Sequence, residues 1–202
     1  MFNRFTRRAL QVLFYARSQV SQLGSLAIEP EHILLGVLDE GNGLGCRILA
    51  RTGVVLDDFR SDIVPRLTGG EKVPEFDEIP FSASCKRALE YAAEEADRLL
   101  QNYIGTEHLL LGLLREERSV AAEVLAARGL RIEAVREAIV ELLSRGEQPE
   151  PPGSAHTAAA RRSGAGDHAG AARDTHAHCA ATMKAKTRLQ PLRTGVKFRW
   201  QA

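Results

Sequence analysis

The sequence predicts an all-α protein that consists of two tandem four-helix repeats followed by a disordered tail. Residues 5–67 align with residues 81–143 without a gap, and 20 of the 63 pairs are identical at this shift of 76 residues. A fixed internal period of this length indicates a duplicated structural unit. Apolar residues in both copies recur at helical intervals, and no long segment alternates with period two, so we expect helices and no strands.

The first helix of each repeat is expected over about residues 6–23 and 82–99. Thr6 and Ser82 are suitable N-caps, because a hydroxyl can accept a hydrogen bond from a free N–H of the first turn. The apolar stripes that follow them are Ala9, Val12, Leu13, Ala16, Val20 and Leu23 in the first copy and Cys85, Leu89, Ala92, Ala96 and Leu99 in the second.

The second helix differs between the copies at its start. In the first copy Pro30 takes an early helical position, where its missing N–H costs nothing. In the second copy we expect Thr106 to be the N-cap of a helix from Glu107 to about Arg115. The glycines of Gly41-Asn42-Gly43 are expected to end the first of these helices.

Two shorter helices complete each repeat. The third and fourth helices are expected at about 44–51 and 56–67 in the first copy and at about 120–127 and 132–143 in the second. Gly53 and Gly129 follow the third helices and suit their ends. A unit of about 65 residues has a small core, so the two copies should pack against each other.

Composition divides the chain into a domain, residues 1–145, and a tail, residues 146–202. The domain contains repeat one (5–67), a linker rich in Gly, Pro and acids (68–80) and repeat two (81–143). It carries 18 Lys/Arg and 22 Asp/Glu, whereas the tail carries 9 and 4, which gives charges of −4 and +5. The basic, low-complexity tail has few large apolar residues to offset its chain entropy, so we expect disorder.

Cysteine usage and hydropathy indicate a reduced, cytoplasmic setting. Cys46 and Cys85 lie on apolar helical stripes and should be buried, and with Cys179 they form no disulfide framework. No apolar run approaches the ~20 residues of a membrane span. The Arg-rich start is similar to a targeting segment, yet residues 5–23 align with residues 81–99, so we expect a core helix there.

No catalytic motif is recognisable, so the sequence predicts neither an ATPase nor a protease. It contains no Gly-Lys-Ser/Thr phosphate loop, no Cys-x-x-Cys, no His-Glu-x-x-His and no Gly-x-Ser-x-Gly. We expect no cofactor and no metal. His176-Ala177-His178-Cys179 in the tail is interpreted as disordered sequence, since no further ligands accompany it.

The conspicuous feature is a Glu-His pair at the start of the second helix, present twice as Glu31-His32 and Glu107-His108. For the histidines we expect a structural role, with the ring satisfied by a backbone carbonyl. Each glutamate either complements the helix dipole or holds a cation such as a guanidinium. The N–H groups of the same helix end suit an anion, so a ligand with both charges, such as a phosphorylated arginine, fits both features.

Three segments together resemble the Clp amino-terminal repeat domain of the ClpC type. They are Phe5-Thr6-x-x-Ala9, Glu31-His32-Ile33-Leu34-Leu35-Gly36 and the segment from Tyr103-Ile104-Gly105-Thr106-Glu107-His108 to Glu116. The resemblance covers residues 1–145 and implies two four-helix repeats related by a pseudo-two-fold axis. It also implies a domain that receives substrates and adaptor proteins and recognises phosphoarginine. The implied ligand-binding residues are Glu107, Thr106, Glu31, Thr6 and Ser82.

The sequence departs from this family at the first motif. Glu29-Pro30 stands where the second copy has Gly105-Thr106, so a backbone donor and a hydroxyl are lost and a negative charge is gained. Ser82 replaces the family's threonine in the second copy. No ATPase module is recognisable after residue 145, and the tail, in which we recognise no motif, is interpreted as a frameshifted or degenerate remnant.

We therefore expect a standalone or truncated substrate- and adaptor-binding module of the Clp proteolytic system. Its expected partners are Clp substrates, adaptor proteins and the Clp ATPase, without a membrane or nucleic acid. A non-functional remnant of a ClpC gene is one alternative. The other is a nucleic-acid-binding protein that acts through the basic tail, which carries Lys184, Lys186, Arg188, Arg193, Lys197 and Arg199.

Overall fold

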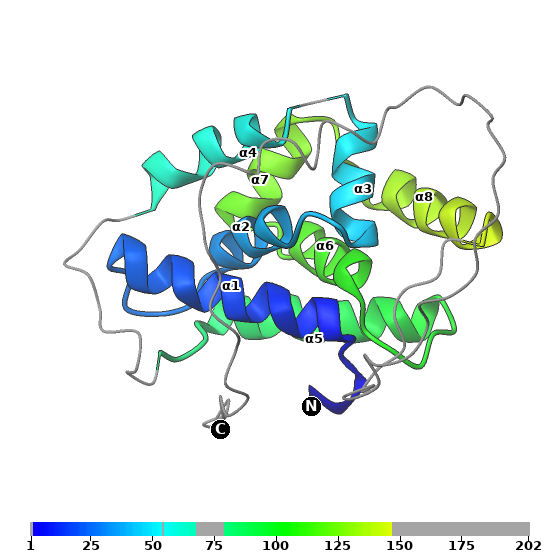
Figure 1. The fold of residues 1–202 in the computed structure, drawn as a ribbon, viewed down its shortest axis with the longest axis horizontal. Coiled ribbons are helices and arrows are strands. Elements are labelled where there is room, and N and C mark those ends of the chain that lie inside the picture. The colour runs from blue at the N-terminus through cyan, green and yellow to red at the C-terminus, as the bar shows by residue number, and fades with distance from the viewer. Residues whose placement is uncertain (1, 54, 68–78, 147–202) are drawn as a thin grey trace, which may run out of the picture. The chain divides into compact units, whose positions relative to one another are not determined.

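The computed structural model describes residues 2–53, 55–67 and 79–146. Most of the linker and the tail from residue 147, including His176, His178 and Cys179, lie outside the described residues. The described part is all-α, as the sequence predicts, and contains eight α-helices (Figure 1). They are α1 (Arg7–Leu23), α2 (Pro30–Glu40), α3 (Leu44–Arg51), α4 (Leu56–Ile63), α5 (Ala83–Arg98), α6 (Thr106–Arg115), α7 (Val120–Ala127) and α8 (Ile132–Ser144), with short 3₁₀ helices η1 (Phe2–Arg4) and η2 (Val64–Arg66).

Two helix boundaries differ from the expectation. Gly105 is the N-cap of α6 and Thr106 is the first residue inside the helix, so Thr106 is not an N-cap. Its hydroxyl is engaged by another helix, as described below. The fourth helix of repeat one ends at Ile63 and continues only as η2, because Pro65 has no N–H to donate to an α-helical bond.

The first two helices of each repeat pack closely through a glycine. A Cβ built at Gly36 of α2 would clash with the backbone oxygen of Val12 in α1. The equivalent clash in repeat two joins Gly112 of α6 to Ala88 of α5. The absence of a side chain at these two positions lets each helix pair approach to backbone contact.

The repeats are tied together by two equivalent pairs of backbone bonds. Phe5 forms a parallel bridge with Ile104, and Ile28 forms one with Phe81. Because each bridge joins the start of one repeat's first helix to the entry of the other repeat's second helix, the two repeats are related by a pseudo-two-fold arrangement. These bridges are isolated, and the described residues contain no strand.

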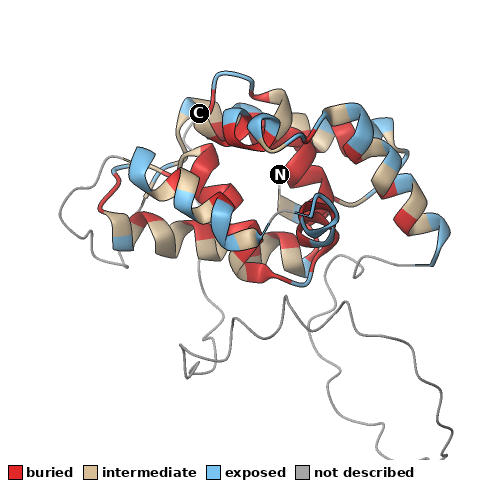
Figure 2. Ribbon diagram, turned by 90° about the horizontal axis from the view of Figure 1, so that it is seen from above, coloured by how far each residue is buried: buried red, intermediate tan, exposed pale blue. Residues whose placement is uncertain are grey.

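The core is shared between the repeats. Helix α3 packs on α6, α7 packs on α2 and α4 packs on α7, so the third helices lie against the opposite repeat. The faces turned toward one another are buried, as Figure 2 shows. Cys46 and Cys85 are both buried free thiols, which confirms the expectation for them. No helix in the described part of the chain is long and apolar enough to cross a membrane.

Candidate functional site

The two Glu-His pairs lie in the first turns of α2 and α6, where all four side chains are buried. Glu31 is 7% exposed, Glu107 is 1% exposed, and both histidines are fully buried. Few titratable side chains are buried to this degree without a partner. The contacts of each glutamate therefore decide what the two sites can do.

Each histidine closes the start of its own helix. Nδ1 of His32 accepts the backbone N–H of Glu29 at 3.0 Å, and Nδ1 of His108 accepts that of Gly105 at 2.9 Å. The partner is thus a backbone N–H and not the expected carbonyl. Burial lowers the pKa of both rings to about 4. Both rings are therefore neutral and carry their proton on Nε2.

The second ring nitrogen distinguishes the repeats. Nε2 of His32 lies 3.2 Å from the hydroxyl of Ser25, whereas Nε2 of His108 has no partner. Gln101 occupies the position equivalent to Ser25, and its Oε1 is likewise buried without a partner. Among the described residues, all three buried side-chain atoms without a partner belong to Gln101, Glu107 and His108.

Both candidate sites are built from two repeats. The backbone N–H of Thr6 donates to the carbonyl of Ile104 at 2.9 Å, which places the first turn of α1 beside the entry to α6. The N–H of Ser82 donates to the carbonyl of Ile28 at 3.1 Å, which places α5 beside the entry to α2. Thr6 therefore lies with Glu107 and Ser82 lies with Glu31, although the sequence repeat would have grouped them the other way.

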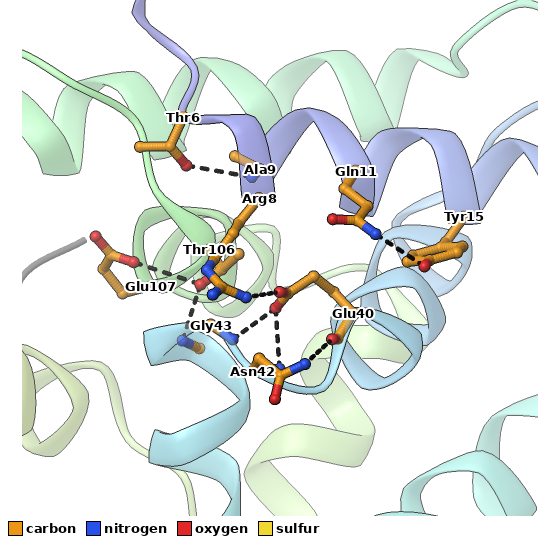
Figure 3. Close-up of polar contacts among 11 residues, drawn as sticks. Thr6, Arg8, Ala9, Gln11, Tyr15, Glu40, Asn42, Gly43, Thr106 and Glu107 are labelled. Atoms are coloured by element: carbon orange, nitrogen blue, oxygen red, sulfur yellow. Dashed lines mark hydrogen bonds and ion pairs between the residues drawn. The ribbon is translucent and has the colours of Figure 1, made fainter. Parts of the chain in front are cut away.

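Thr6 and Ser82 are N-caps, as their sequence context predicts. The hydroxyl of Thr6 accepts the N–H of Ala9 at 3.2 Å, a bond drawn in Figure 3. The hydroxyl of Ser82 accepts the N–H of Cys85 at 3.1 Å. Each hydroxyl marks a helix N-terminus, where the helix dipole favours negative charge.

Glu107 is held at the start of α6 with one oxygen uncommitted. Its Oε2 lies 3.4 Å from the hydroxyl of Thr106, which also accepts the N–H of Gly45 in α3 at 3.0 Å (Figure 3). Its Oε1 has no partner. The carboxyl lies against Gly105, where a Cβ would overlap it. Burial raises the pKa of Glu107 to about 7.

Glu31 forms a hydrogen bond to the opposite repeat. Its Oε1 accepts the N–H of Ala121 at 3.2 Å, near the start of α7. Burial raises the pKa of Glu31, the backbone bonds oppose that shift, and the charge of Glu29 adds to it. Glu29 stands where repeat two has Gly105, so the space that Glu107 uses in repeat two is not available in repeat one.

The charged residues around the two sites differ in position. The helix N-terminus beside Glu107 carries Arg7 and Arg8 in its first turn, and Arg4 precedes it. Arg8 is paired with Glu40 (Figure 3), and both the Glu40 carboxylate and the Thr106 hydroxyl lie against Gly43. The N-terminus of α5, beside Glu31, has no charged residue at positions 83 or 84, its basic residues begin at Lys86, and Glu29 contributes a negative charge at the entry to α2. Basic residues therefore begin earlier beside Glu107 than beside Glu31, although Arg4 and Arg8 are paired with Asp97 and Glu40.

Sequence reasoning missed Gly45 and Ala121, whose backbone N–H groups engage the site residues. No side-chain motif marks such groups. The 76-residue shift does pair Gly45 with Ala121 and Pro30 with Thr106. The alignment therefore identifies these positions as equivalent, but it does not show which atoms contact one another. Within the described residues, no three His, Cys, Asp or Glu side chains are grouped to hold a metal ion.

The chain matches one protein family in two segments. Residues 4–105 and residues 80–176 each match the Clp repeat (R) N-terminal domain. These segments together span most of the chain and contain both Glu-His pairs.

Curated relatives are Clp ATP-binding subunits and chaperones. The ATP-dependent Clp protease ATP-binding subunit ClpA homolog of Guillardia theta is 44% identical over 146 residues, which are 71% of this chain and 17% of that protein. The chloroplastic chaperone protein ClpC1 of Oryza sativa subsp. japonica is 41% identical over 157 residues, 76% of this chain and 16% of that protein. The chain thus spans about a sixth of the length of these relatives.

Solved structures share the fold. The N-terminal domain of the chaperone ClpD from Arabidopsis thaliana superposes with a TM-score of 0.55 at 26% identity, over 71% of this chain and 97% of that one. The Hsp104 N-terminal domain from Candida albicans gives 0.57 at 21% identity, over 71% and 93%, which shows the fold alone. With the internal duplication, the helix arrangement and the paired Glu-His motifs, these matches show that the chain belongs to the Clp repeat N-terminal domain family.

Proposed function

We propose that this chain is a substrate- and adaptor-binding module of the Clp ATP-dependent protease and chaperone system, and that it binds phosphoarginine-marked proteins. Membership of the family supports the general role. The observation that carries the specific role is Glu107, a buried carboxyl with an uncommitted oxygen beside the basic N-terminus of α1. A guanidinium needs such a carboxylate, and its phosphate needs such a helix end.

In this proposal the second site is dominant. Glu107 turns outward to pair with the guanidinium, and the Thr6 end of α1, with its arginines, receives the phosphate. The site around Glu31 and Ser82 is weaker for two reasons. One oxygen of Glu31 is held by the N–H of Ala121, and Glu29 repels the phosphate.

The partners follow from this role. They are marked substrates, adaptor proteins and the Clp ATPase, with a cytoplasmic location, although the rice ClpC1 relative is chloroplastic. The chain itself supplies recognition and no catalysis.

Calorimetric titration of the full chain with free phosphoarginine tests the proposal, with arginine and phosphoserine as control ligands. We expect one dominant site that needs both charges of the ligand. Glu107→Ala should remove most binding, whereas the matched change Glu31→Ala should do little. Loss of one charge-assisted hydrogen bond weakens the binding free energy by roughly 1.5–3 kcal/mol, which lowers the affinity about tenfold or more.

Two equal sites, or a larger effect of Glu31→Ala, would contradict the asymmetry. If phosphoarginine does not bind at all, adaptor binding becomes the role to test. Restoring glycine and threonine together, as Glu29→Gly with Pro30→Thr, should strengthen the first site.

A further inference from the structure

Each repeat stabilises the third helix of the other repeat at the same backbone position, but with a side chain from a different position of its own. In repeat two the hydroxyl of Thr106 accepts the N–H of Gly45, the second residue of α3. In repeat one the carboxylate of Glu31 accepts the N–H of Ala121, the second residue of α7. Gly45 and Ala121 are separated by the 76 residues of the duplication, so both bonds serve the same structural need.

The difference follows from one residue pair. Thr106 has a hydroxyl within reach of α3, whereas Pro30 at the equivalent position has none. A buried backbone N–H without a partner is costly, so in repeat one the neighbouring Glu31 meets the need of α7. In repeat two that need is already met, and Oε1 of Glu107 is left without a partner.

We propose that Thr106 is a positioning residue, which takes over the cap of α3 and thereby keeps the carboxyl of Glu107 available for a cationic ligand. Pro30 removes this function from repeat one and leaves Glu31 occupied. This inference rests on the proposed function and deepens it, since it names what decides which of the two sites can accept a guanidinium. It assigns Thr106 to the helix start of α3 and not to the ligand.

The titration of the Glu107 carboxyl can be followed by itself, because the groups around it do not change their charge in the same pH range. His108 Nδ1 lies 3.6 Å away but accepts the N–H of Gly105 and is neutral. Tyr103, in the loop before α6, interacts with Glu107, and burial together with that carboxyl raises the pKa of Tyr103 to about 12. From the side of α1, Arg8 pairs with Glu40 (Figure 3), whose carboxylate lies with the Thr106 hydroxyl against Gly43. From the side of α3 the nearest group is the backbone N–H of Gly45.

The test compares Thr106→Val with Thr106→Ser by nuclear magnetic resonance on the full chain. Valine keeps the shape of threonine without the hydroxyl, so the carboxylate of Glu107 should turn onto the N–H of Gly45. We expect the midpoint of the Glu107 carboxyl titration to fall by at least one pH unit and the Gly45 amide to follow that titration. Phosphoarginine affinity should fall about tenfold. Serine keeps a hydroxyl, so in Thr106→Ser both the Glu107 titration and the phosphoarginine affinity should stay close to those of the unmodified chain.

The matched change in repeat one is Pro30→Thr. It should supply a hydroxyl to the N–H of Ala121, so that the Ala121 amide no longer follows the titration of Glu31. An unchanged Glu107 titration in Thr106→Val, or a failure of Thr106→Ser to restore it, would overturn the assignment. The titrations need no ligand. Absence of phosphoarginine binding by the unmodified chain would therefore refute the proposed phosphoarginine recognition, while the titrations would still decide the role of Thr106.

Discussion

Repeat one and repeat two carry the same Glu-His pair on the same helix, yet the two glutamates have opposite relations to their surroundings. Glu31 is bonded across the interface to α7, while Glu107 keeps one oxygen without a partner at the start of α6. The motif is identical, and the two residues before it differ. The comparison shows that duplicated motifs diverge through the neighbours that compete for their polar atoms.

A second pair of equivalent clusters diverged by exchange of charge. In repeat one Asp39 of α2 accepts from Arg60 of α4, and Gln19 of α1 bonds to it. In repeat two the acid lies at the position of Gln19, as Glu95 of α5. Two arginines, Arg136 and Arg115, surround it. Each cluster joins the first, second and fourth helices of its repeat, so both repeats have the same connection between helices but place the acid on a different helix.

Removing the acid from these two clusters should give the largest difference between the repeats. Glu95 is fully buried and bonded to both arms of the Arg136 guanidinium at 2.8 and 2.9 Å, whereas the side chain of Asp39 is 23% exposed. Breaking a buried pair costs about 3–5 kcal/mol, and a partly exposed pair about 1 kcal/mol or less. We expect Glu95→Ala to lower the free energy of unfolding by the first amount and Asp39→Ala by the second, measured in urea.

A pH series provides the control for this prediction. Burial opposes ionisation of Glu95, but the bonds and charges of its arginines outweigh burial and lower its pKa. Its stabilisation is therefore present above the unfolded pKa of about 4.5 and is lost as the pH falls through the folded value. The difference between the unmodified chain and Glu95→Gln should shrink in acid. A difference that stays constant with pH would show that the carboxylate charge is not what stabilises the cluster.

Glu107 should make stability depend on pH in the opposite sense. Its pKa is raised by burial to about 7, so the folded state retains a proton that the unfolded state has lost between about pH 4.5 and 7. Stability must then fall as the pH rises through this range. One pKa unit corresponds to 1.36 kcal/mol, so Glu107→Gln should stabilise the domain by about 3 kcal/mol at pH 8 and hardly at all at pH 4.5.

The matched variant for this series is Glu31→Gln. The amide oxygen of glutamine can still accept the N–H of Ala121. Burial raises the pKa of Glu31 but backbone hydrogen bonds oppose the rise, so the gain at pH 8 should be smaller. Urea unfolding at both pH values measures the two effects. Parallel pH curves for the unmodified chain and Glu107→Gln would contradict a neutral, buried Glu107.

The helices could be predicted from the sequence because their signals are local. The apolar stripes, the caps at Thr6 and Ser82 and the glycine at the end of α2 lie within a few residues of the boundaries they set. The sequence pattern predicts the start of α6 one residue late, because a threonine before a helical stripe is expected to cap its own helix. In the structure the hydroxyl of Thr106 serves α3, which is 61 residues away in sequence.

The candidate site could be predicted as a set of residues but not as an arrangement. The resemblance located Glu31, Glu107, Thr6 and Ser82. The partnership of Thr6 with Glu107 depends on the backbone bridge to Ile104, a long-range pairing that no single segment encodes. Burial of both glutamates depends likewise on helices from the opposite repeat. Local patterns therefore located the chemistry, and the packing of the two copies determined its geometry.

Gly105→Ala should disturb the second site with little loss of stability. The added Cβ would overlap the carboxyl of Glu107, which is the end of a flexible side chain and can move. We expect the carboxyl to turn outward and the midpoint of its titration to fall toward 4.5, with at most about 1 kcal/mol lost, since alanine is a poorer N-cap than glycine. Residue 29 already carries a side chain, so Glu29→Ala should leave the titration of Glu31 almost unchanged apart from the lost charge.

The smallest difference expected between the repeats concerns the second nitrogen of each histidine. Ser25→Ala removes the partner of His32 Nε2 and leaves a buried donor unsatisfied, which costs roughly 1–3 kcal/mol. Because this hydroxyl lies near the end of α1, where adjustment and water can compensate, we expect about 1 kcal/mol. Gln101→Ala removes an oxygen that has no partner, so it should change the free energy of unfolding by less than about 0.5 kcal/mol. Equal losses in urea unfolding would mean that Gln101 and His108 interact in solution, and that the two repeats are more alike at this position than their contacts indicate.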